Sequence, residues 1–324
     1  MTDPTRRLAP VVRIAPAKLN LTLAIVGRRS DGFHALHSVM VPLALADRLS
    51  LAVMPAGDDT LHTSGFDPGP PESNLVTKAI RGARAALRGS GTATPPLAVR
   101  LAKQIPVAAG LAGGSSDAAA AIDAALEAWG GELTQERQAE LAAFLGSDVP
   151  FFLAGGPALV EGRGERLTPL HGLRGDAQPG LLLVTPAVAA RTADVFAAWA
   201  AGAMAEPGVA RRTSEHFASE FGSGLTGRQL VERAGVLAAA NDLLPAAASV
   251  VPGLVPLRRA LTRLLGRPIG LSGSGPTLWA VYPSVDAASE AATSVRTAVD
   301  EGTIPAPGER PPFVAATTIQ RSDR

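Results

Sequence analysis

The sequence predicts a protein of two domains in which helices and strands are mixed, of the α+β or α/β class. At 324 residues, the chain is longer than one typical domain. Strand-like patterns dominate its first part, and helical and strand-like patterns alternate afterwards, as is typical of mixed folds. Turn-forming residues cluster over residues 166–180. We therefore expect two domains, residues 1–168 and 169–324.

The first part of the chain alternates in the manner of strands. Residues 11–26 predict a strand that we expect to break at Pro16. Beyond that break, Lys18, Asn20 and Thr22 share one face, which is either exposed to solvent or part of a site.

Helices with caps follow. Residues 55–72 are rich in Gly, Pro and Asp and predict a loop. A helix should run from its N-cap Ser73 to Arg88, and a strand over residues 97–101 should follow. A second helix is predicted over residues 134–145, capped by Thr134.

The second half alternates strands and helices. A buried strand is predicted over residues 181–185, and helices over 192–201 and 254–265. Residues 202–228 are polar and show no clear period, so we expect a mobile insertion. The Asn241-Asp242-Leu243-Leu244 stretch is expected to be helical, and the Pro-rich tail from Pro305 onward is expected to fray.

The most informative stretch is residues 106–117. Glycines at 110, 113 and 114 allow close approach of backbone N–H groups, and an Ala-rich helix should begin near Ser115 and end near Trp129. A helix start supplies free N–H donors and the positive end of a dipole. We favour a phosphate site over an ordinary serine-capped turn. No lysine follows Gly114 and the glycine spacing differs from G-x-G-x-x-G, so neither Walker A nor a dinucleotide motif fits.

Two charged residues suit phosphoryl transfer. Of the 30 basic residues only three are lysines, Lys18, Lys78 and Lys103, and in such a background a lysine points to a place that favours an ammonium over a guanidinium. Asp148 follows a predicted helix end and precedes an apolar Phe pair, where a carboxylate can orient a hydroxyl, although an ordinary turn fits the same residues. A phosphate cradle, a cation and such a carboxylate are what phosphoryl transfer requires.

Composition limits the partners. The formal net charge is +1 and there is no cysteine, so nothing indicates nucleic acid or an anionic membrane surface, and disulfides and thiolate metal sites are excluded. No signal peptide and no long apolar run are recognisable. We expect a soluble cytoplasmic protein, a monomer or weak homodimer. No residue cluster has metal-ligand spacing, so any Mg²⁺ would be carried by nucleotide phosphates.

Six motifs occur in the order found in one known family, between about residues 13 and 283. The motifs are Pro16-Ala17-Lys18-Leu19-Asn20, Asp31-Gly32-Phe33-His34, Gly113-Gly114-Ser115-Ser116-Asp117, Gly146-Ser147-Asp148-Val149-Pro150, Asn241-Asp242-Leu243 and Ser272-Gly273-Ser274-Gly275. With these motifs the chain resembles the GHMP kinases, and more narrowly their branch that acts on 4-diphosphocytidyl-2-C-methyl-D-erythritol.

The resemblance implies a fold and an activity. The fold is the two-domain α+β GHMP architecture, with an ATP-binding phosphate-loop domain over residues 1–168 and a ferredoxin-like domain over residues 169–324. The activity is transfer of the γ-phosphate of ATP to the 2-hydroxyl of the diphosphocytidyl substrate, in the non-mevalonate isoprenoid pathway.

The resemblance also implies roles for residues. Lys18 and Asp148 would be the catalytic pair, the first stabilising charge and the second orienting or deprotonating the hydroxyl. Asn20 would contact the substrate, His34 would bond the cytosine edge, and Phe33 and Phe196 would stack on its two faces with Thr192 nearby. The residues implied to bind ATP are Asn74, Lys103, Pro106, Val107, Ala108, Ala109, Gly110, Leu111, Ala112, Gly113, Gly114, Ser115 and Ser116.

Two departures and two alternatives accompany this interpretation. Ala108, Ala109 and Ala112 stand where many relatives have glycine; we expect negative φ angles and a stiffer loop there. Residues 202–228 exceed what the family needs. The chain could instead be another GHMP kinase, such as a homoserine kinase, which would need no base clamp. It could also be a catalytically silent nucleotide-binding regulator, against which intact Lys18 and Asp148 argue.

Overall fold

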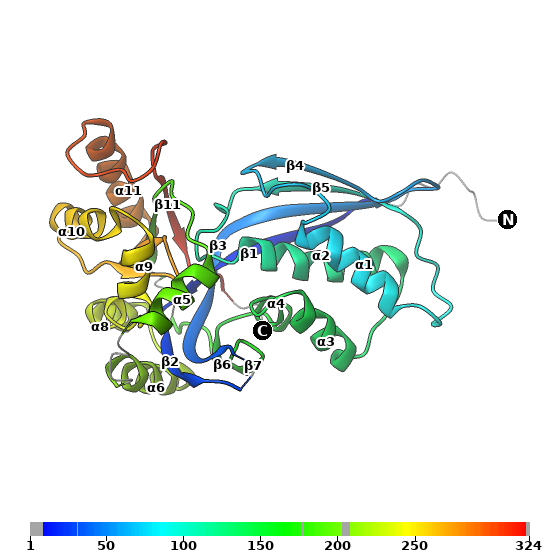
Figure 1. The fold of residues 1–324 in the computed structure, drawn as a ribbon, viewed down its shortest axis with the longest axis horizontal. Coiled ribbons are helices and arrows are strands. Elements are labelled where there is room, and N and C mark those ends of the chain that lie inside the picture. The colour runs from blue at the N-terminus through cyan, green and yellow to red at the C-terminus, as the bar shows by residue number, and fades with distance from the viewer. Residues whose placement is uncertain (1–8, 31, 176–177, 203–207, 322–324) are drawn as a thin grey trace. The chain divides into compact units, whose positions relative to one another are not determined.

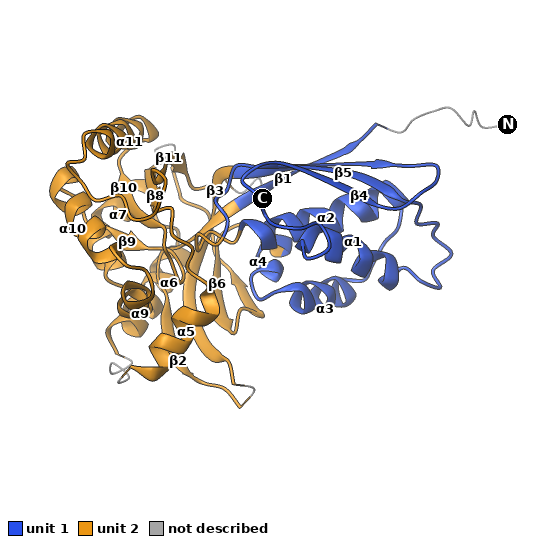
Figure 2. Ribbon diagram, turned by 45° about the horizontal axis from the view of Figure 1, so that its top comes forward, with its two compact units in different colours: residues 1–16, 46–107, 113–153 blue, residues 17–45, 108–112, 154–324 orange. Residues whose placement is uncertain are grey.

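The computed structural model describes residues 9–30, 32–175, 178–202 and 208–321. Asp31 of the Asp-Gly-Phe-His motif therefore lies outside the described residues, as do residues 203–207 of the expected insertion. The chain divides into two compact units, each assembled from several segments (Figure 2). Unit 1 comprises residues 1–16, 46–107 and 113–153, and unit 2 comprises residues 17–45, 108–112 and 154–324. The domain boundary at 168/169 stays a prediction.

Unit 1 is a sheet with helices packed on one face (Figure 1). The second half of β3 (His34–Val53) pairs antiparallel with β5 (Leu97–Lys103), and β5 pairs parallel with β4 (Thr60–Gly65). Its helices are α1 (Leu75–Ala86), α2 (Gly113–Trp129), α3 (Gln135–Leu145) and α4 (Val149–Ala154). Alternate strand residues and the alanines of α2 form one buried apolar core. The small side chains of α2 let this helix pack closely against α1.

Unit 2 contains a separate four-stranded antiparallel sheet in the order β11-β8-β10-β9. Its strands are β8 (Gly180–Thr185), β9 (Gly270–Leu271), β10 (Leu278–Tyr282) and β11 (Phe313–Thr318). Helices connect β8 to β9, and α11 (Val285–Asp300) connects β10 to β11. This βαββαβ order is the ferredoxin-like arrangement, so the predicted fold class is confirmed.

The rest of unit 2 surrounds the first half of β3. This half pairs with β2 (Ala24–Arg28) and β6 (Ala158–Gly162), and β6 pairs with β7 (Arg166–Pro169). The helices before β9 are α5 (Thr192–Ala201), α6 (Val209–Gly222), α7 (Gly227–Glu232), α8 (Ala234–Ala238), α9 (Leu244–Val250) and α10 (Leu254–Leu265). Among the described residues, no helix is long and apolar enough to cross a membrane.

Several local predictions are confirmed. The helices expected over 192–201 and 254–265 have those bounds, and Thr134 caps α3 by accepting a hydrogen bond from Arg137 N at 3.3 Å. The strands expected over 97–101 and 181–185 are β5 and β8.

Other local predictions are wrong near the N-terminus. Strand β1 (Val11–Asn20) continues through Pro16; among the named strands it pairs with β3 alone, and a strand with one neighbour tolerates a proline. Residues 55–72 are not all loop, since β4 lies among them. The N-cap of α1 is Asn74 rather than Ser73, because the Asn74 side chain accepts from Val76 N at 2.9 Å.

The remaining corrections concern unit 2. Within residues 202–228 lie α6 and the start of α7, and α6 buries one apolar face, so the expected mobile insertion is wrong for the described part. Asn241 forms a bridge with Leu23 before α9 begins. Within the described part of the C-terminal tail, residues 313–318 do not fray, since β11 pairs along the whole of β8.

Candidate active site

The glycine-rich loop leads directly into α2. That helix begins at Gly113, two residues before the predicted start, so Ser115 and Ser116 lie in its first turn. The first-turn N–H groups of a helix have no intrahelical acceptor and attract anions. Ser116 Oγ is buried, and no described residue forms a hydrogen bond with it. A buried hydroxyl at a helix start fits a phosphate oxygen or a phosphate-bound Mg²⁺.

The loop itself contradicts one expectation. Ala108 and Ala112 have φ angles of 53° and 54°, in the left-handed region, where a Cβ crowds the backbone at a cost of roughly 1–2 kcal/mol. The expectation of negative φ angles at these alanines is therefore wrong. Strain of this kind persists where surrounding contacts impose the conformation, and both residues lie in the segment 108–112, which unit 2 contacts hold.

Those contacts come from the Ser-Gly-Ser-Gly motif and from Thr277, two residues after it, and Asn241 in turn holds that motif. Ser272 Oγ donates to Gly110 O at 3.0 Å, and Thr277 N donates to Ala109 O at 3.3 Å. The amide of Asn241 donates to the carbonyls of Leu271 and Gly273, each at 2.9 Å. The loop segment 108–112 and the motifs that contain Asn241 and Ser272 thus meet within unit 2.

Two further motifs meet within unit 1. Asp148 lies in the turn that precedes α4, after Gly146 at the end of α3. A Cβ placed on Gly146 would lie 3.8 Å from Ser115 Oγ. The turn that carries Asp148 is therefore adjacent to the first turn of α2, as the phosphate-site prediction requires.

Lys103 lies under the start of α2. A Cβ on Gly113 would lie 3.1 Å from Lys103 Nζ, so the glycine allows this approach. The ammonium forms buried ion pairs with Asp47 and, at 2.7 Å, with Asp117. Asp47 also accepts hydrogen bonds from the N–H groups of Gln104 and Ile105, at 2.5 and 2.9 Å.

The two carboxylates and one ammonium are not balanced in charge. Burial raises the pKa of Asp117 to about 7, with the neighbouring Asp47 acting in the same direction against the attraction of Lys103. The buried cluster is neutral only when one carboxyl carries a proton. Asp117 Oδ1 has no hydrogen-bond partner among the described residues, so a proton at that oxygen fits the geometry. Sequence reasoning assigned no role to either aspartate, although Asp117 ends one of the six motifs.

Lys18 and Asn20 lie at the end of β1, in unit 2. Their side chains are buried, so the solvent-exposed alternative is wrong. Lys18 Nζ donates to Asn20 Oδ1, and Asn20 Nδ2 donates to Ser38 Oγ at 2.8 Å. Lys18 belongs to unit 2 and Asp148 to unit 1, so the convergence of these two side chains stays a prediction.

Two of the predicted base-binding residues, His34 and Phe196, come together in unit 2. The His34 ring stacks on Phe196 with ring centroids 5.5 Å apart, and Trp199 packs edge-on against His34 at 5.1 Å. Phe33 is about half exposed, with the Arg163 guanidinium 5.3 Å from its ring centroid. Burial, together with the charge of Arg28, lowers the pKa of His34, which favours a neutral imidazole with one donor and one acceptor. Trp199 and Arg163 were not predicted.

The remaining predicted residues are Thr192 and Asn74. Thr192 Oγ1 lies 3.2 Å from Ser274 Oγ of the Ser-Gly-Ser-Gly motif, at the start of the helix that carries Phe196. Asn74 is buried, and its Oδ1 is used as the α1 cap. Its Nδ2 is the part of the side chain that such a cap leaves for a ligand.

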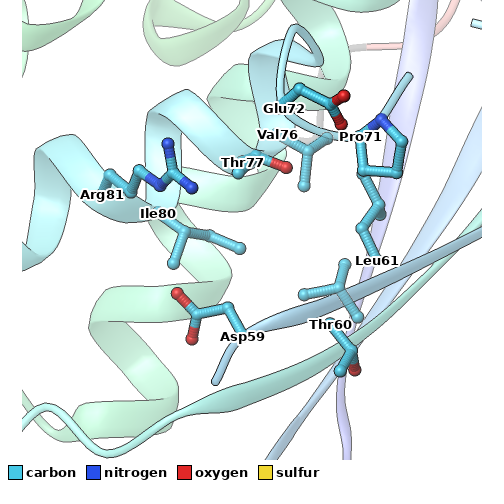
Figure 3. A pocket seen from close by; sticks show the side chains of 10 residues that line it. Asp59, Thr60, Leu61, Pro71, Glu72, Val76, Thr77, Ile80 and Arg81 are labelled. Carbon is cyan, nitrogen blue, oxygen red and sulfur yellow. The ribbon is translucent and has the colours of Figure 1, made fainter. Parts of the chain in front are cut away.

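A separate pocket in unit 1 contains none of the predicted residues (Figure 3). Its volume is about 180 Å³, and it lies between α1 and the edge of β4. Asp59 at its rim is held by Arg84, with two oxygen–nitrogen distances of 2.6 and 2.8 Å, and by Leu97 N at 2.9 Å. This carboxylate connects α1 to the start of β5 and so has a structural role.

Comparison with known proteins agrees with this geometry. The model of the GHMP kinase N-terminal domain matches residues 74–156, which include α1, the loop, α2 and Asp148. A homoserine kinase structure from Cytophaga hutchinsonii aligns over 99% of this chain and 98% of its own, with a TM-score of 0.66 and 19% identity, and so shows the fold alone. Fold and loop together define a GHMP kinase.

Closer relatives narrow the class. The 4-diphosphocytidyl-2-C-methyl-D-erythritol kinases of Pelotomaculum thermopropionicum and Anaeromyxobacter sp. are 36% and 37% identical, over 88% and 95% of this chain and 94% and 92% of theirs. A crystal structure of 4-(cytidine 5'-diphospho)-2C-methyl-D-erythritol kinase aligns over 95% of this chain and 99% of its own, with a TM-score of 0.66 and 30% identity. The chain belongs to the 4-diphosphocytidyl-2-C-methyl-D-erythritol kinase family.

Proposed function

We propose that the protein transfers the γ-phosphate of ATP to the 2-hydroxyl of 4-diphosphocytidyl-2-C-methyl-D-erythritol, giving the 2-phosphate and ADP in the non-mevalonate isoprenoid pathway. The identity to the named relatives over most of both chains carries this proposal. The stacked pair His34 and Phe196 supports the cytidyl substrate in particular, because a small amino-acid alcohol offers no ring to stack. We expect the enzyme in the cytoplasm, as a monomer or weak homodimer.

Asp148 and Lys18 are the proposed catalytic pair. The Asp148 carboxylate orients the 2-hydroxyl and accepts its proton as the oxygen attacks the γ-phosphorus. The bond from phosphorus to the β,γ-bridging oxygen breaks, and ADP leaves with its electron pair. The Lys18 ammonium stabilises negative charge on the equatorial phosphoryl oxygens. The buried amide of Asn20 limits the positions that the ammonium can adopt.

Residues 106–116 are proposed to bind the ATP phosphates. The first-turn N–H groups of α2 face the anion, and Ser115 and Ser116 add hydroxyl ligands. Mg²⁺, carried by the nucleotide phosphates, would neutralise charge there. Asn74 and Lys103 are proposed to lie near the nucleotide; with its ammonium held by two carboxylates, Lys103 acts by supporting the start of α2.

Release of ADP measured with several acceptors tests the proposal. We expect turnover with 4-diphosphocytidyl-2-C-methyl-D-erythritol and none above background with homoserine or mevalonate. Preferred turnover of homoserine would establish the alternative GHMP kinase. ATP binding without turnover of any acceptor would establish the silent regulator.

Asp148→Asn tests the proton acceptor. The amide keeps the shape but cannot take a proton, so we expect turnover to fall by about 10²–10⁴-fold while the affinity for ATP stays unchanged. Ser147→Ala, one residue earlier and exposed, is the matched control. Undiminished turnover of Asp148→Asn would remove this carboxylate from the chemistry.

A further inference from the structure

Helix α6 contributes a buried hydroxyl to a polar cluster that extends to the proposed catalytic lysine. The helix lies within residues 202–228, the segment to which the sequence assigned no role. Ser214, at 0% exposure, lies on its inner face with Phe217 and Phe221. Its Oγ lies 2.7 Å from Thr22 Oγ1, 2.8 Å from His37 Nδ1 and 3.2 Å from His37 O. Ser214 is therefore part of a buried hydrogen-bonded cluster and does more than fill space in the core.

The donors in this cluster can be assigned. Val39 N donates to Thr22 Oγ1 at 3.0 Å, so the Thr22 hydroxyl proton remains for Ser214 Oγ. Ser214 in turn donates to His37, at Nδ1 or at the carbonyl. Burial lowers the pKa of His37, with Glu161, Glu215 and Arg211 as its charged neighbours. A neutral ring accepts at Nδ1 when its proton is on Nε2; when the proton is on Nδ1, that nitrogen donates to Ser214 Oγ and Ser214 donates to the His37 carbonyl. Each hydroxyl thus has an acceptor and a donor.

The cluster continues to Lys18 through three hydrogen bonds. Ser38 Oγ donates to Thr22 O at 2.5 Å and accepts from Asn20 Nδ2 at 2.8 Å. Since Asn20 Nδ2 is the donor, Asn20 Oδ1 faces the Lys18 ammonium, which donates to it. The path from α6 to Lys18 consists entirely of buried groups of unit 2, and displacement of any one leaves an unsatisfied polar atom.

We propose that Ser214 is a positioning residue for phosphoryl transfer, which, through Thr22, Ser38 and Asn20, holds the amide that orients the Lys18 ammonium. This inference rests on the proposed function, in which Lys18 stabilises the transferred phosphoryl group. The proposal explains why α6 has a serine at this position, since an alanine would pack equally well on the same face of the helix.

Steady-state kinetics of Ser214→Ala tests the inference. We expect kcat to fall by about tenfold, within the range of coupling through packed networks, and KM for ATP to change by less than about twofold, because the phosphate loop is not touched. Ser219→Ala, exposed on the same helix, is the control and should keep wild-type kinetics. A purely structural role would lower the melting temperature and leave kcat per folded molecule unchanged.

A second pair of variants keeps the test decisive if Ser214→Ala folds poorly. Thr22→Val removes the hydroxyl and keeps the shape, whereas Thr22→Ser keeps the hydroxyl. We expect loss of kcat in the first and near-complete recovery in the second. Equal kinetics in the two variants would overturn the inference.

Lys18→Ala, assayed in parallel, separates the two proposals. If it abolishes turnover while Ser214→Ala and Thr22→Val both turn over at the wild-type rate, the inference fails and the proposed function stands. If Lys18→Ala keeps wild-type turnover, the catalytic role of the lysine fails, and the positioning role of Ser214 with it.

Discussion

The two compact units support their buried lysines, Lys103 in unit 1 and Lys18 in unit 2, in different ways. Unit 1 buries a charged cluster, in which Lys103 lies between Asp47 and Asp117. Unit 2 buries a chain of neutral groups, the side chains of Asn20, Ser38, Thr22 and Ser214. Both lie beside residues to which we assign a role in phosphoryl transfer. The same requirement, a fixed support for a reacting group, is thus met by charge in one unit and by directed hydrogen bonds in the other.

The difference has energetic consequences. Charges removed from water carry a desolvation penalty that only close partners offset, so loss of one partner is expensive. The cluster also holds an excess carboxylate, which makes it sensitive to pH. A chain of neutral hydrogen bonds costs less to bury and does not titrate. The comparison therefore predicts large, pH-dependent effects in unit 1 and smaller, pH-independent effects in unit 2.

Removing the ammonium of unit 1 should have the largest effect. In Lys103→Met two carboxyl groups stay buried without their cation, so we expect the free energy of unfolding to fall by about 3–5 kcal/mol. Urea unfolding at neutral pH measures this change. Lys78→Met, on the exposed face of α1, should cost less than about 0.5 kcal/mol. Similar values for the two lysines would mean that the cluster does not stabilise unit 1.

Asp117→Asn should change how stability depends on pH. The pKa of this carboxyl is raised in the folded protein, so the stability that its proton confers is present below the unfolded pKa and is lost as pH rises through about 7. The variant, neutral at every pH, should therefore gain on the wild type by about 1 kcal/mol per pH unit between roughly pH 4 and 7. Unfolding curves at several pH values check this.

Asp58→Asn is the matched control for that measurement, because Asp58 is exposed in the same unit. Its unfolding curves at the same pH values provide the baseline against which the Asp117→Asn curves are compared. Parallel pH curves for Asp117→Asn and the wild type would show that Asp117 stays ionised.

Ser38→Ala tests the neutral chain of unit 2. It leaves the Asn20 amide and the Thr22 carbonyl without their partner, which should cost about 1–3 kcal/mol. Because neither group titrates, the cost should be equal at pH 5 and pH 8. The exposed Ser219→Ala on α6 is the control. A cost that differs between the two pH values would mean that His37, next in the chain, is coupled to these hydrogen bonds.

Part of this contrast could have been predicted from the sequence. The alternation that buries Leu97, Val99 and Leu101 also buries Lys103, and a buried lysine needs a carboxylate. What the spacing could not supply is the partner, since Asp47 lies 56 residues earlier on another strand. The phosphate loop and α2 were predictable because the glycines, the serines and the start of the Ala-rich helix all lie within residues 106–117.

The role of α6 was missed for a different reason. Ala210, Ser214, Phe217 and Phe221 recur at helical spacing and are all buried, but the serine interrupts the apolar pattern. Its position is explained by the partners of its hydroxyl, Thr22 between β1 and β2 and His37 on β3, which no local pattern reveals. A polar residue in phase with apolar ones is therefore a signal of a buried hydrogen bond.

The smallest expected effect concerns the loop alanines, whose φ angles the sequence could not predict. Ala112→Gly removes the left-handed strain at φ 54°, roughly 1–2 kcal/mol. Glycine's extra freedom in the unfolded chain offsets about 0.5–1 kcal/mol of this gain. We expect a net stabilisation of at most about 1 kcal/mol, measured by urea unfolding.

Ala109→Gly, in the same loop but without a positive φ, is the matched control and should destabilise, because it adds the same freedom and relieves no strain. If both variants destabilise equally, the backbone at Ala112 carries no strain. If only Ala112→Gly stabilises and its KM for ATP rises, the strain holds the loop in the shape that binds phosphate.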